Sequence, residues 1–329
     1  MKVDRGFVLR ATLGIAISVG AVWLLLRSVD VGAAIEVLRR ANLAAVALMV
    51  VTVLFDVAAR GARWRALLAP IRPLPYRRVL GYTYVGYLAN NVLPARLGEL
   101  VRSHALGEGE GLSRPTVLGT VVVERIVDTV IVVALAAVAV VLLGVGGVVS
   151  TAVVLGAIFV GVLVLGLVVA VTSHRLPGAD RVTVLAERVP RLLDLGRRLR
   201  DGLAVVGRPA AVGQAILLSL LAWSASITTF IVAGAAIGVP LTPAQGALLS
   251  SGVALATIVP SGPGYLGTFE LTAVGIATQF GVHPDSAFAL ALLVHAMILV
   301  VTSVGGAIAA LRLGVGLGTG GAQPRAEAS

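Results

Sequence analysis

Long uninterrupted apolar runs dominate this sequence and limit what the chain can fold into. Roughly 20 apolar residues in a helix cross the roughly 30 Å hydrocarbon core of a bilayer, and several of the runs are long enough to do so. The runs are continuous rather than alternating, which excludes a transmembrane β-barrel. Only 13% of the residues are charged, against about 25% in a typical soluble domain. The sequence therefore predicts an all-α polytopic membrane protein.

The charged residues are mostly basic. Lys and Arg number 26 against 16 Asp and Glu, which gives a formal net charge of +10. In a soluble chain this excess would suggest nucleic acid, but beside apolar spans the positive-inside rule and anionic lipid head groups explain it better. We therefore expect a membrane and an anionic lipid as partners, and no nucleic acid.

Residue types that would carry metal or cofactor chemistry are scarce. The chain has no cysteine, and its 4 histidines lack the spacing of a zinc motif. The sequence also has no Walker-type phosphate loop, so we expect no ATP hydrolysis. We expect neither a metal nor a cofactor, and we do not expect an enzyme.

Six of the apolar runs are predicted to cross the membrane fully, with both termini cytoplasmic and the inner (plasma) membrane as the location. Their ranges are 7–26, 43–59, 116–143, 150–172, 210–237 and 285–311. The arginines at positions 60, 63, 65, 72, 77 and 78 predict a cytoplasmic loop, and the basic segment 173–208 predicts another. The predicted membrane domain covers residues 1–312, and the tail 313–329 is predicted to be disordered.

The segments 79–115 and 247–281 do not fit as simple spans. Each has an apolar approach, a Pro/Gly break and a continuing helix with an acid near its start. Such a break frees backbone groups that lipid cannot satisfy, so it must be buried in protein or line a wet cavity. If the basic loops are cytoplasmic and the six spans cross fully, the first segment must enter and leave on the cytoplasmic face and the second on the outer face. We predict two re-entrant helical hairpins of opposite orientation, although hydropathy alone allows a count of eight or more spans.

A short internal repeat connects the two breaks. The sequence PARLGE at 94–99 is similar to PGYLGTFE at 263–270, since both have Pro-x-x-Leu-Gly followed by a nearby Glu. The two copies lie about half a chain apart, on hairpins predicted to have opposite orientation. This arrangement is typical of inverted-repeat transporters, whose broken helices in the two halves mark a binding site near the midplane.

Ionisable residues cluster after the first break and at the start of the next span. The first group, spaced three apart on one side of a helix, is Arg96, Glu99 and Arg102. The second group is Glu124, Arg125 and Asp128. Ionisable groups within apolar stretches are costly, so by default they face a bundle interior or a cavity.

Two interpretations of this cluster stay open. Either the arginines neutralise the acids and fix the hairpin to the span, or they present forked donors to a phosphate or carboxylate that enters from the cytoplasmic leaflet. Both hold if the acids release the arginines when substrate arrives. The candidate substrate-binding residues are Asn90, Asn91, Arg96, Glu99, Arg102, Glu124, Arg125, Asp128, Tyr265 and Glu270.

Several neighbouring residues also have more than one interpretation. Glu270 either pairs with Arg125 or is a proton-coupling carboxylate. Asn90 and Asn91 either cap the broken helix, which we favour, or touch substrate. Asp56 and Arg60 form an i,i+4 pair that we expect to be structural, and His295 is expected to be a hydrogen-bonded core residue.

Three motifs resemble a known family. NVLPARLGELVR at 91–102, ERIVD at 124–128 and PSGPGYLGTFE at 260–270 are similar to the flippase-like membrane domain of the lysylphosphatidylglycerol synthase family. In bifunctional members this domain flips the lipid made by an attached soluble synthase domain. The longest extramembrane segment here, 173–208, is too short to hold such a domain, so the resemblance implies the stand-alone membrane domain and not the lysyl transfer. Relatives of that kind are thought to handle lipids or lipid-linked sugars.

The leading expectation is a translocase for an anionic phospholipid or a polyprenyl-phosphate-linked lipid. Its movement of lipid would be passive, ion-coupled or driven by a partner. One alternative is an intramembrane lipid-modifying enzyme with Glu124 and Asp128 as acid and base. The other is a non-catalytic partner of a separate synthase or glycosyltransferase. A second copy of the chain, in a homodimer, is a further candidate partner.

Overall fold

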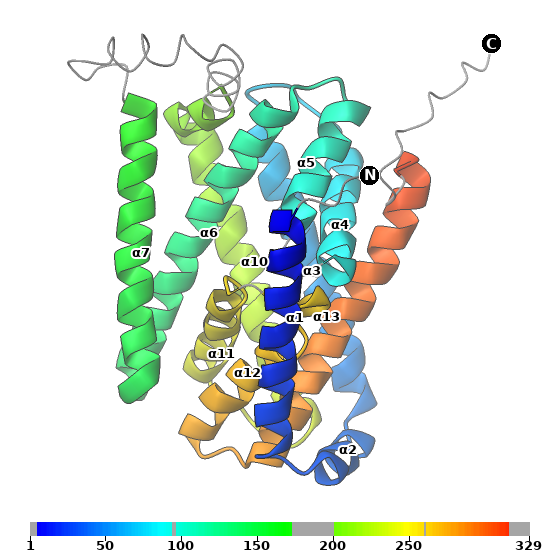
Figure 1. Cartoon of the computed structure of the whole chain (residues 1–329), viewed down its shortest axis with the longest axis vertical. Coiled ribbons are helices and arrows are strands. Elements are labelled where there is room, and N and C mark those ends of the chain that lie inside the picture. The colour runs from blue at the N-terminus through cyan, green and yellow to red at the C-terminus, as the bar shows by residue number, and fades with distance from the viewer. Residues whose placement is uncertain (1–4, 94–96, 173–200, 260, 316–329) are drawn as a thin grey trace.

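The computed structural model describes residues 5–93, 97–172, 201–259 and 261–315, and these residues form helices and connecting turns without a β-strand (Figure 1). The α-helices are α1 (Arg5–Leu26), α2 (Val31–Arg39), α3 (Leu43–Leu68), α4 (Tyr76–Val92), α5 (Gly98–Gly109), α6 (Arg114–Leu143), α7 (Gly147–Thr172), α10 (Pro209–Ala236), α11 (Pro243–Ala256), α12 (Thr268–Ala277) and α13 (Pro284–Leu313). Short 3₁₀ turns are η2 (Ala204–Gly207), η3 (Pro263–Tyr265) and η4 (Thr278–Phe280). The prediction of an all-α polytopic membrane protein is confirmed.

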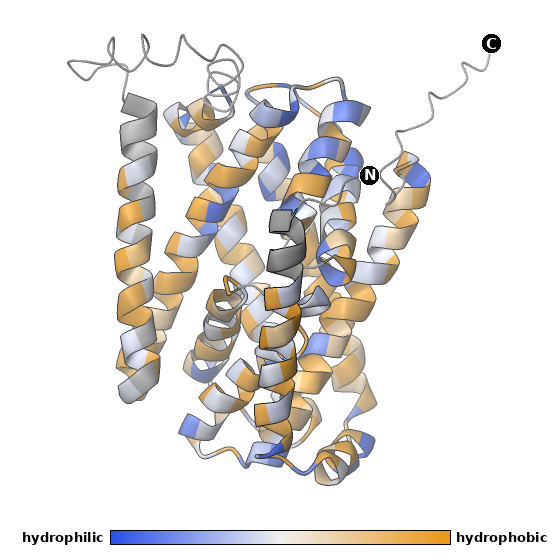
Figure 2. Cartoon of the chain, viewed as in Figure 1, coloured by the Kyte–Doolittle hydropathy of each residue, from blue (hydrophilic) through white to orange (hydrophobic). Residues whose placement is uncertain are grey.

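Length and composition identify the helices able to cross a membrane. In the described residues, α3, α6, α10 and α13 each meet that test, and the pair formed by α1 and α2, bent by 83°, would add a fifth span. Figure 2 shows apolar residues along most of α7 and α13 and hydrophilic residues gathered toward the two ends of the bundle and part-way along α6. This distribution is the one expected for helices that face lipid.

Local sequence signals set where the helices begin and end. The Asn42 side chain accepts hydrogen bonds from the backbone N–H groups of residues 44 and 45 at the start of α3, and Thr242 forms a capping box with Gln245 at the start of α11. Gly144 and Gly314 end α6 and α13 with the left-handed backbone that favours glycine.

The two broken segments form hairpins that enter the bundle from opposite ends. The pair α4–α5 occupies one half of the molecule, and the pair α11–α12 occupies the other half (Figure 1). Within the first hairpin, Gly98 lies so close to α4 that an added Cβ would be 2.0 Å from the Gly86 carbonyl oxygen. Only glycine permits this approach. Pro94 to Arg96, in the break itself, lie outside the described residues.

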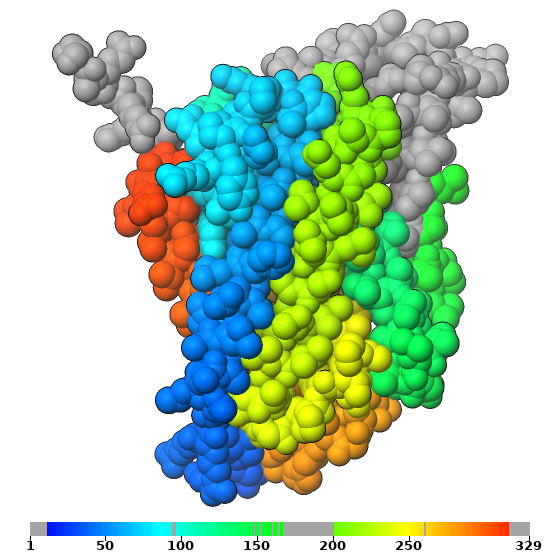
Figure 3. Space-filling view, turned by 180° about the vertical axis from the view of Figure 1, so that it is seen from behind, coloured from blue at the N-terminus to red at the C-terminus, as the bar shows by residue number. Residues whose placement is uncertain are grey.

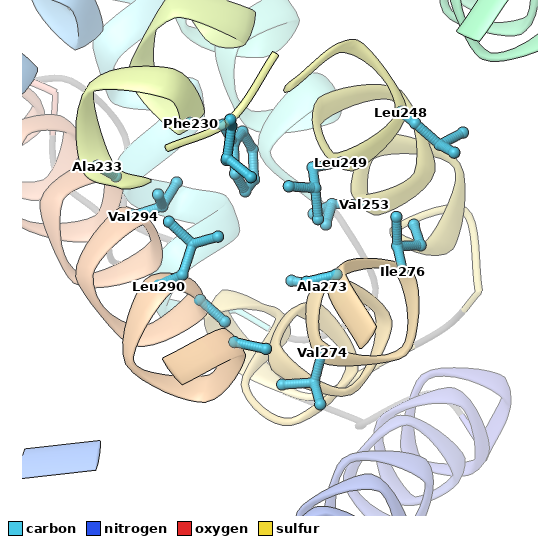
Figure 4. Packing of buried hydrophobic residues seen from close by; sticks show 14 of the residues in the cluster. Phe230, Ala233, Leu248, Leu249, Val253, Ala273, Val274, Ile276, Leu290 and Val294 are labelled. Carbon is cyan, nitrogen blue, oxygen red and sulfur yellow. The ribbon is translucent and has the colours of Figure 1, made fainter. Parts of the chain in front are cut away.

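Helices α3 and α10 pack side by side along their length and form the face seen in Figure 3. Around the second hairpin, apolar side chains of α10, α11, α12 and α13 point toward one another (Figure 4). Phe230, Leu249, Ala273 and Leu290 are among the buried members of this core. The core holds the second hairpin against the full-length helices.

The second span is longer than expected. The predicted span ended at residue 59, before a loop of cytoplasmic arginines, but α3 continues to Leu68. Arg60 and Arg63 are inside the helix, with 8% and 0% of their surface exposed. The placement of these two arginines in a cytoplasmic loop was therefore wrong. Acids compensate both charges, Asp56 on α3 and Asp128 on α6 for Arg60, and Glu124 and Asp128 on α6 for Arg63. A hydropathy profile registers a charge without its partner.

Two further predictions concern segments that the structure describes only in part. Residues 173–200 of the basic segment 173–208 lie outside the described residues, and so do residues 316–329 of the tail 313–329.

Candidate functional site

A buried network of arginines and carboxylates joins α3, α5 and α6. The Arg63 Nη2 atom lies 3.0 Å from Glu124 Oε1, and the Arg102 Nη2 atom lies 2.7 Å from the same oxygen. Arg63 also forms an ion pair with Asp128. The Glu124 side chain is 1% exposed and that of Arg63 is fully buried. Because an unpaired charge is so costly in this setting, the network ties the first hairpin to two full-length helices.

The network continues through Asp128 toward α10. Arg60 donates from Nε to Asp56 at 2.9 Å, and its Nη1 atom lies 3.5 Å from Asp128 Oδ2. The indole Nε1 of Trp223 donates to Asp128 Oδ1 at 3.2 Å. The Arg60 guanidinium carbon also lies 4.8 Å from the centre of the Trp223 ring, a cation–π contact. Asp128 thus receives donors from three helices.

Arg125 is the member of the network with the greatest exposure. It forms ion pairs with Glu124 and, at 3.0 Å, with Asp128 Oδ2, yet 36% of its side-chain surface is exposed. Its buried Nε has no hydrogen-bond partner among the described residues. One guanidinium therefore combines a fixed position with an accessible face.

The two asparagines before the first break hold the hairpin in place. The Asn90 side-chain oxygen accepts a hydrogen bond from the Gly98 N–H at 2.7 Å, so it caps α5 across the break. Asn91 donates from Nδ2 to the hydroxyls of Thr302 and Ser303 on α13, each at 2.9 Å. Both side chains have a structural contact, and both still line the cavity described next.

The second break is built around a buried carboxylate and an imidazole. Glu270 Oε1 lies 2.5 Å from His295 Nδ1, and the other ring nitrogen, Nε2, lies 2.7 Å from the Gly264 carbonyl oxygen. Glu270 Oε2 accepts a hydrogen bond from the Gly267 N–H at 2.7 Å. Among the described residues Glu270 pairs with His295, from α13, rather than with Arg125 as one interpretation of the sequence held.

A cavity of about 580 Å³ lies between the two hairpins. Its wall is formed by α3, α4, α5, α6, α7, α10, α11, α12 and α13 and by the second break. One part of the wall is ionisable and includes Asp56, Arg60, Glu99, Arg125 and Asp128. Another part is apolar and aromatic and includes Val253, Leu255, Ile258, Phe269 and Leu299. Among the described residues, no three His, Asp or Glu side chains are grouped as a metal site.

Comparison with known proteins places the chain in a family. Residues 11–306 match the lysylphosphatidylglycerol synthase TM region. The chain belongs to this family. It is also 31% identical, over an alignment 348 positions long including gaps, to a protein of Haloferax volcanii named glycosyltransferase AglD. That alignment covers 93% of this chain and 55% of the relative, so the chain spans about half the length of the curated relative it matches.

Most of the candidate substrate-binding residues predicted from the sequence lie at or beside the cavity. The residues that line the cavity are Asn90, Asn91, Glu99, Arg125, Asp128 and Tyr265. Arg102 and Glu124 lie directly behind them in the ion-pair network, and Glu270 is linked to the cavity through His295. Arg96 lies outside the described residues. The prediction that these side chains bind substrate stays a prediction.

Several residues of the site were not predicted from the sequence. Arg60 and Arg63 were assigned to a loop, and Trp223 was not among the candidate site residues, although the expected i,i+4 pair of Asp56 and Arg60 is confirmed. Asp56, Arg60 and Arg63 are spaced four and three apart, the spacing that places residues on one face of a helix. That periodicity, continued past residue 59, was the signal that α3 extends further.

Proposed function

We propose that this protein moves an anionic lipid, either a phospholipid or a polyprenyl-phosphate-linked lipid, between the two leaflets of the membrane. The observation that carries the proposal is the position of Arg125, which is fixed by Glu124 and Asp128 and still 36% exposed on the wall of the cavity. A guanidinium presents a planar fork of donors that matches the oxygens of a phosphate. Arg60, which is held by Asp56, lines the same wall and offers a second guanidinium.

The division of the cavity wall favours a lipid over a soluble anion. Arginines and acids line one part, whereas Ile258, Phe269 and Leu299 line another. A lipid has the same division between a charged head group and apolar chains. Phe159 on α7 and Ile258 both line the cavity and are each 46% exposed, so the apolar lining continues toward the outside of the bundle. Acyl or prenyl chains can remain in the bilayer there while the head group is bound.

The contacts of the two acids favour lipid movement over an intramembrane enzyme. Glu124 forms ion pairs with Arg63, Arg102 and Arg125. Asp128 forms ion pairs with arginines and accepts a hydrogen bond from the Trp223 indole. A general acid must carry a proton, but carboxylates surrounded by guanidinium groups are stabilised in the ionised form. We therefore assign these acids to holding the arginines rather than to acid–base catalysis.

Alternating exposure of one site is the mechanism that the architecture supports. The hairpins enter from opposite ends, and the cavity lies between their breaks. Inverted hairpins of this kind allow one site to open first to one face and then to the other by a rocking movement. We further propose that both termini are cytoplasmic and that the membrane is the inner (plasma) membrane, because the arginine-rich segments then lie inside.

A second candidate function is that of a membrane partner for a separate glycosyltransferase or synthase. Its support is that the matching relative is named a glycosyltransferase and that this chain spans only 55% of it. In that case the cavity would hold a lipid-linked substrate for an enzyme on another chain. Movement of lipid by the purified protein alone would favour the first candidate.

The test uses purified protein in liposomes that carry head-group-labelled phosphatidylglycerol or a labelled polyprenyl phosphate. Wild-type protein is expected to expose inner-leaflet label to a membrane-impermeant quencher. Arg125→Ala is expected to slow this exposure by about tenfold or more, because a hydrogen bond to a charged group contributes roughly 1.5–3 kcal/mol.

The matched control is Arg39→Ala, since Arg39 on α2 is 74% exposed and pairs only loosely, at 3.7 Å, with Glu36. It is expected to move lipid at the wild-type rate. If folded wild-type protein moves neither lipid, the translocase proposal is wrong and the partner function is favoured. If Arg125→Ala and Arg39→Ala behave alike, the cavity is not the head-group site.

A further inference from the structure

We propose that Glu270 and His295 form a proton-binding site that couples lipid movement to a proton gradient, an inference that rests on the function proposed above. The two side chains are 5% and 4% exposed and come from different elements, the second hairpin and α13. His295 also lines the cavity. The pair is separate from the arginine network, which belongs to the first hairpin and the helices beside it.

The positions of the heavy atoms fix how many protons the resting pair holds. The Gly264 carbonyl oxygen can only accept, so at 2.7 Å the His295 Nε2 must carry a hydrogen. The contact of 2.5 Å between Nδ1 and Glu270 Oε1 also needs a hydrogen between the two atoms. The resting pair therefore holds two protons and has no net charge, whether as imidazolium with carboxylate or as imidazole with carboxylic acid.

Loss of one proton makes this geometry unfavourable. One hydrogen then remains for two contacts: either the carboxylate oxygen faces the lone pair of Nδ1 at 2.5 Å, or the Gly264 carbonyl oxygen faces the lone pair of Nε2 at 2.7 Å. Both side chains are held in place, since Glu270 Oε2 accepts from the Gly267 N–H and the Phe269 ring stacks on the His295 ring with 4.2 Å between the ring centres. One of the two contacts must open, and both hold residues of the second hairpin, so proton release and movement of the second break are linked.

The contact between His295 and Gly264 holds the backbone of the second break in an unusual conformation. His295 binds the carbonyl of Gly264, which has a φ of 62°, and the next residue, Tyr265, has a φ of 59°. A non-glycine residue in the left-handed region is held there by its surroundings rather than by its own preference. Tyr265 lines the cavity beside this turn. Opening of the pair therefore frees a strained turn on the cavity wall.

Other ionisable groups share the cavity with the pair and set its electrostatic surroundings. They are Asp56 and Arg60 from α3, Tyr87 from α4, Glu99 from α5, Arg125 and Asp128 from α6, and Tyr265 from the second break. Helices α10 and α11 have no ionisable residue, and residues 12–26 of α1 have none either. On α13 the other charged residues, Asp285 and Arg312, lie near its two ends, and on α2 Glu36 and Arg39 are exposed. A phosphate entering at Arg60 and Arg125 is the change in charge that would alter proton binding by the pair.

The charge balance of the transport step is simple. One proton binds to the Glu270–His295 pair when the cavity is open to one face, and it leaves to the other face after the cavity reopens there. A lipid with one negative charge moves with it, so the net transfer is electroneutral. At equilibrium a pH difference of one unit then sustains about a tenfold difference in lipid concentration between the leaflets.

The experiment measures the leaflet distribution of labelled phosphatidylglycerol in proteoliposomes with and without a pH difference of one unit. A dye inside the vesicles reports proton entry at the same time. Wild-type protein is expected to build an asymmetry of up to about tenfold and to carry protons only when the lipid is present. Glu270→Gln keeps the shape of the side chain and can hydrogen-bond to His295 without a shared proton, and it is expected to build no asymmetry.

The matched control is His283→Gln, because His283 is 74% exposed beside Asp285 at the start of α13. It is expected to build the wild-type asymmetry. Wild-type protein that moves lipid equally well but ignores the pH difference would overturn this inference and leave the translocase proposal intact. Wild-type protein that moves no lipid under any condition would overturn both.

Discussion

Arg63 and Asp128 form a buried ion pair between α3 and α6, in which the arginine side chain is fully buried and the aspartate is 6% exposed. Arg63 also lies 3.0 Å from Glu124, so one guanidinium serves both acids of the 124–128 motif. Its partners in the chain are more than 60 residues away. The first hairpin then joins the pair through Arg102, which binds the same Glu124 oxygen. Arg63 thus helps to hold together α3, α5 and α6, which form part of the cavity wall.

We predict that Arg63→Met strongly destabilises the protein. Removing one member of a buried pair leaves the others uncompensated, at a cost of roughly 3–5 kcal/mol. Equilibrium unfolding in detergent micelles measures the loss. Arg39→Met is the control, since an exposed ion pair contributes about 1 kcal/mol or less. Equal stability of the two variants would show that the network does not stabilise the fold.

The sequence was sufficient to predict the helical architecture and the places where two segments break. Pro94, Gly98 and the glycines around Pro263 mark those breaks directly, because proline and glycine free the backbone from helix geometry. The distribution of positive charge then gave the opposite orientation of the hairpins. Local composition carries this information, so no knowledge of tertiary contacts was needed.

The pairing of charges was not predictable in the same way. Arg63 was placed in a loop because a hydropathy profile registers its charge and not the acids that neutralise it, which are on another helix. His295 was expected to be a hydrogen-bonded core residue, and it is one, but its partner Glu270 is 25 positions away. Ion pairs between distant helices depend on how the helices pack, and a single sequence does not specify that packing.

Gly98→Ala is predicted to disrupt the first hairpin. A Cβ at this position would lie 2.0 Å from the Gly86 carbonyl oxygen and 2.6 Å from the Asn90 side-chain oxygen. Backbone atoms cannot yield by that distance, so α5 must move away from α4 and lose the Asn90 cap. We expect a loss of several degrees or more in thermal midpoint, measured in detergent.

The control for this substitution is Gly275→Ala, which lies within α12 and has no atom within 4 Å of the added Cβ. Alanine is favoured over glycine in a helix by about 1 kcal/mol, so this variant should melt at or slightly above the wild-type temperature. Identical melting of both variants would contradict the close packing of α4 and α5.

Arg125→Lys is predicted to weaken binding of the lipid head group while keeping the positive charge. Lysine is a point charge without the forked donors of arginine, so one of two hydrogen bonds to a phosphate is lost. A loss of about 1.4 kcal/mol corresponds to about tenfold in affinity. Titration of the purified protein with phosphatidylglycerol measures it, with Arg39→Lys as the exposed control. Unchanged affinity would mean that Arg125 contributes charge alone or does not contact the lipid.

The opposite orientation of the hairpins predicts the side from which the outer end of each can be labelled. The chain has no cysteine, so a single introduced cysteine reports its own location. Glu108, in the last turn of α5 at the open end of the first hairpin, is 36% exposed, and His283, after the second hairpin, is 74% exposed. With a membrane-impermeant maleimide, Glu108→Cys should label only in inside-out vesicles and His283→Cys only in intact cells. Labelling of both from the same side would exclude inverted hairpins, because one of the two segments would then have to cross the membrane completely.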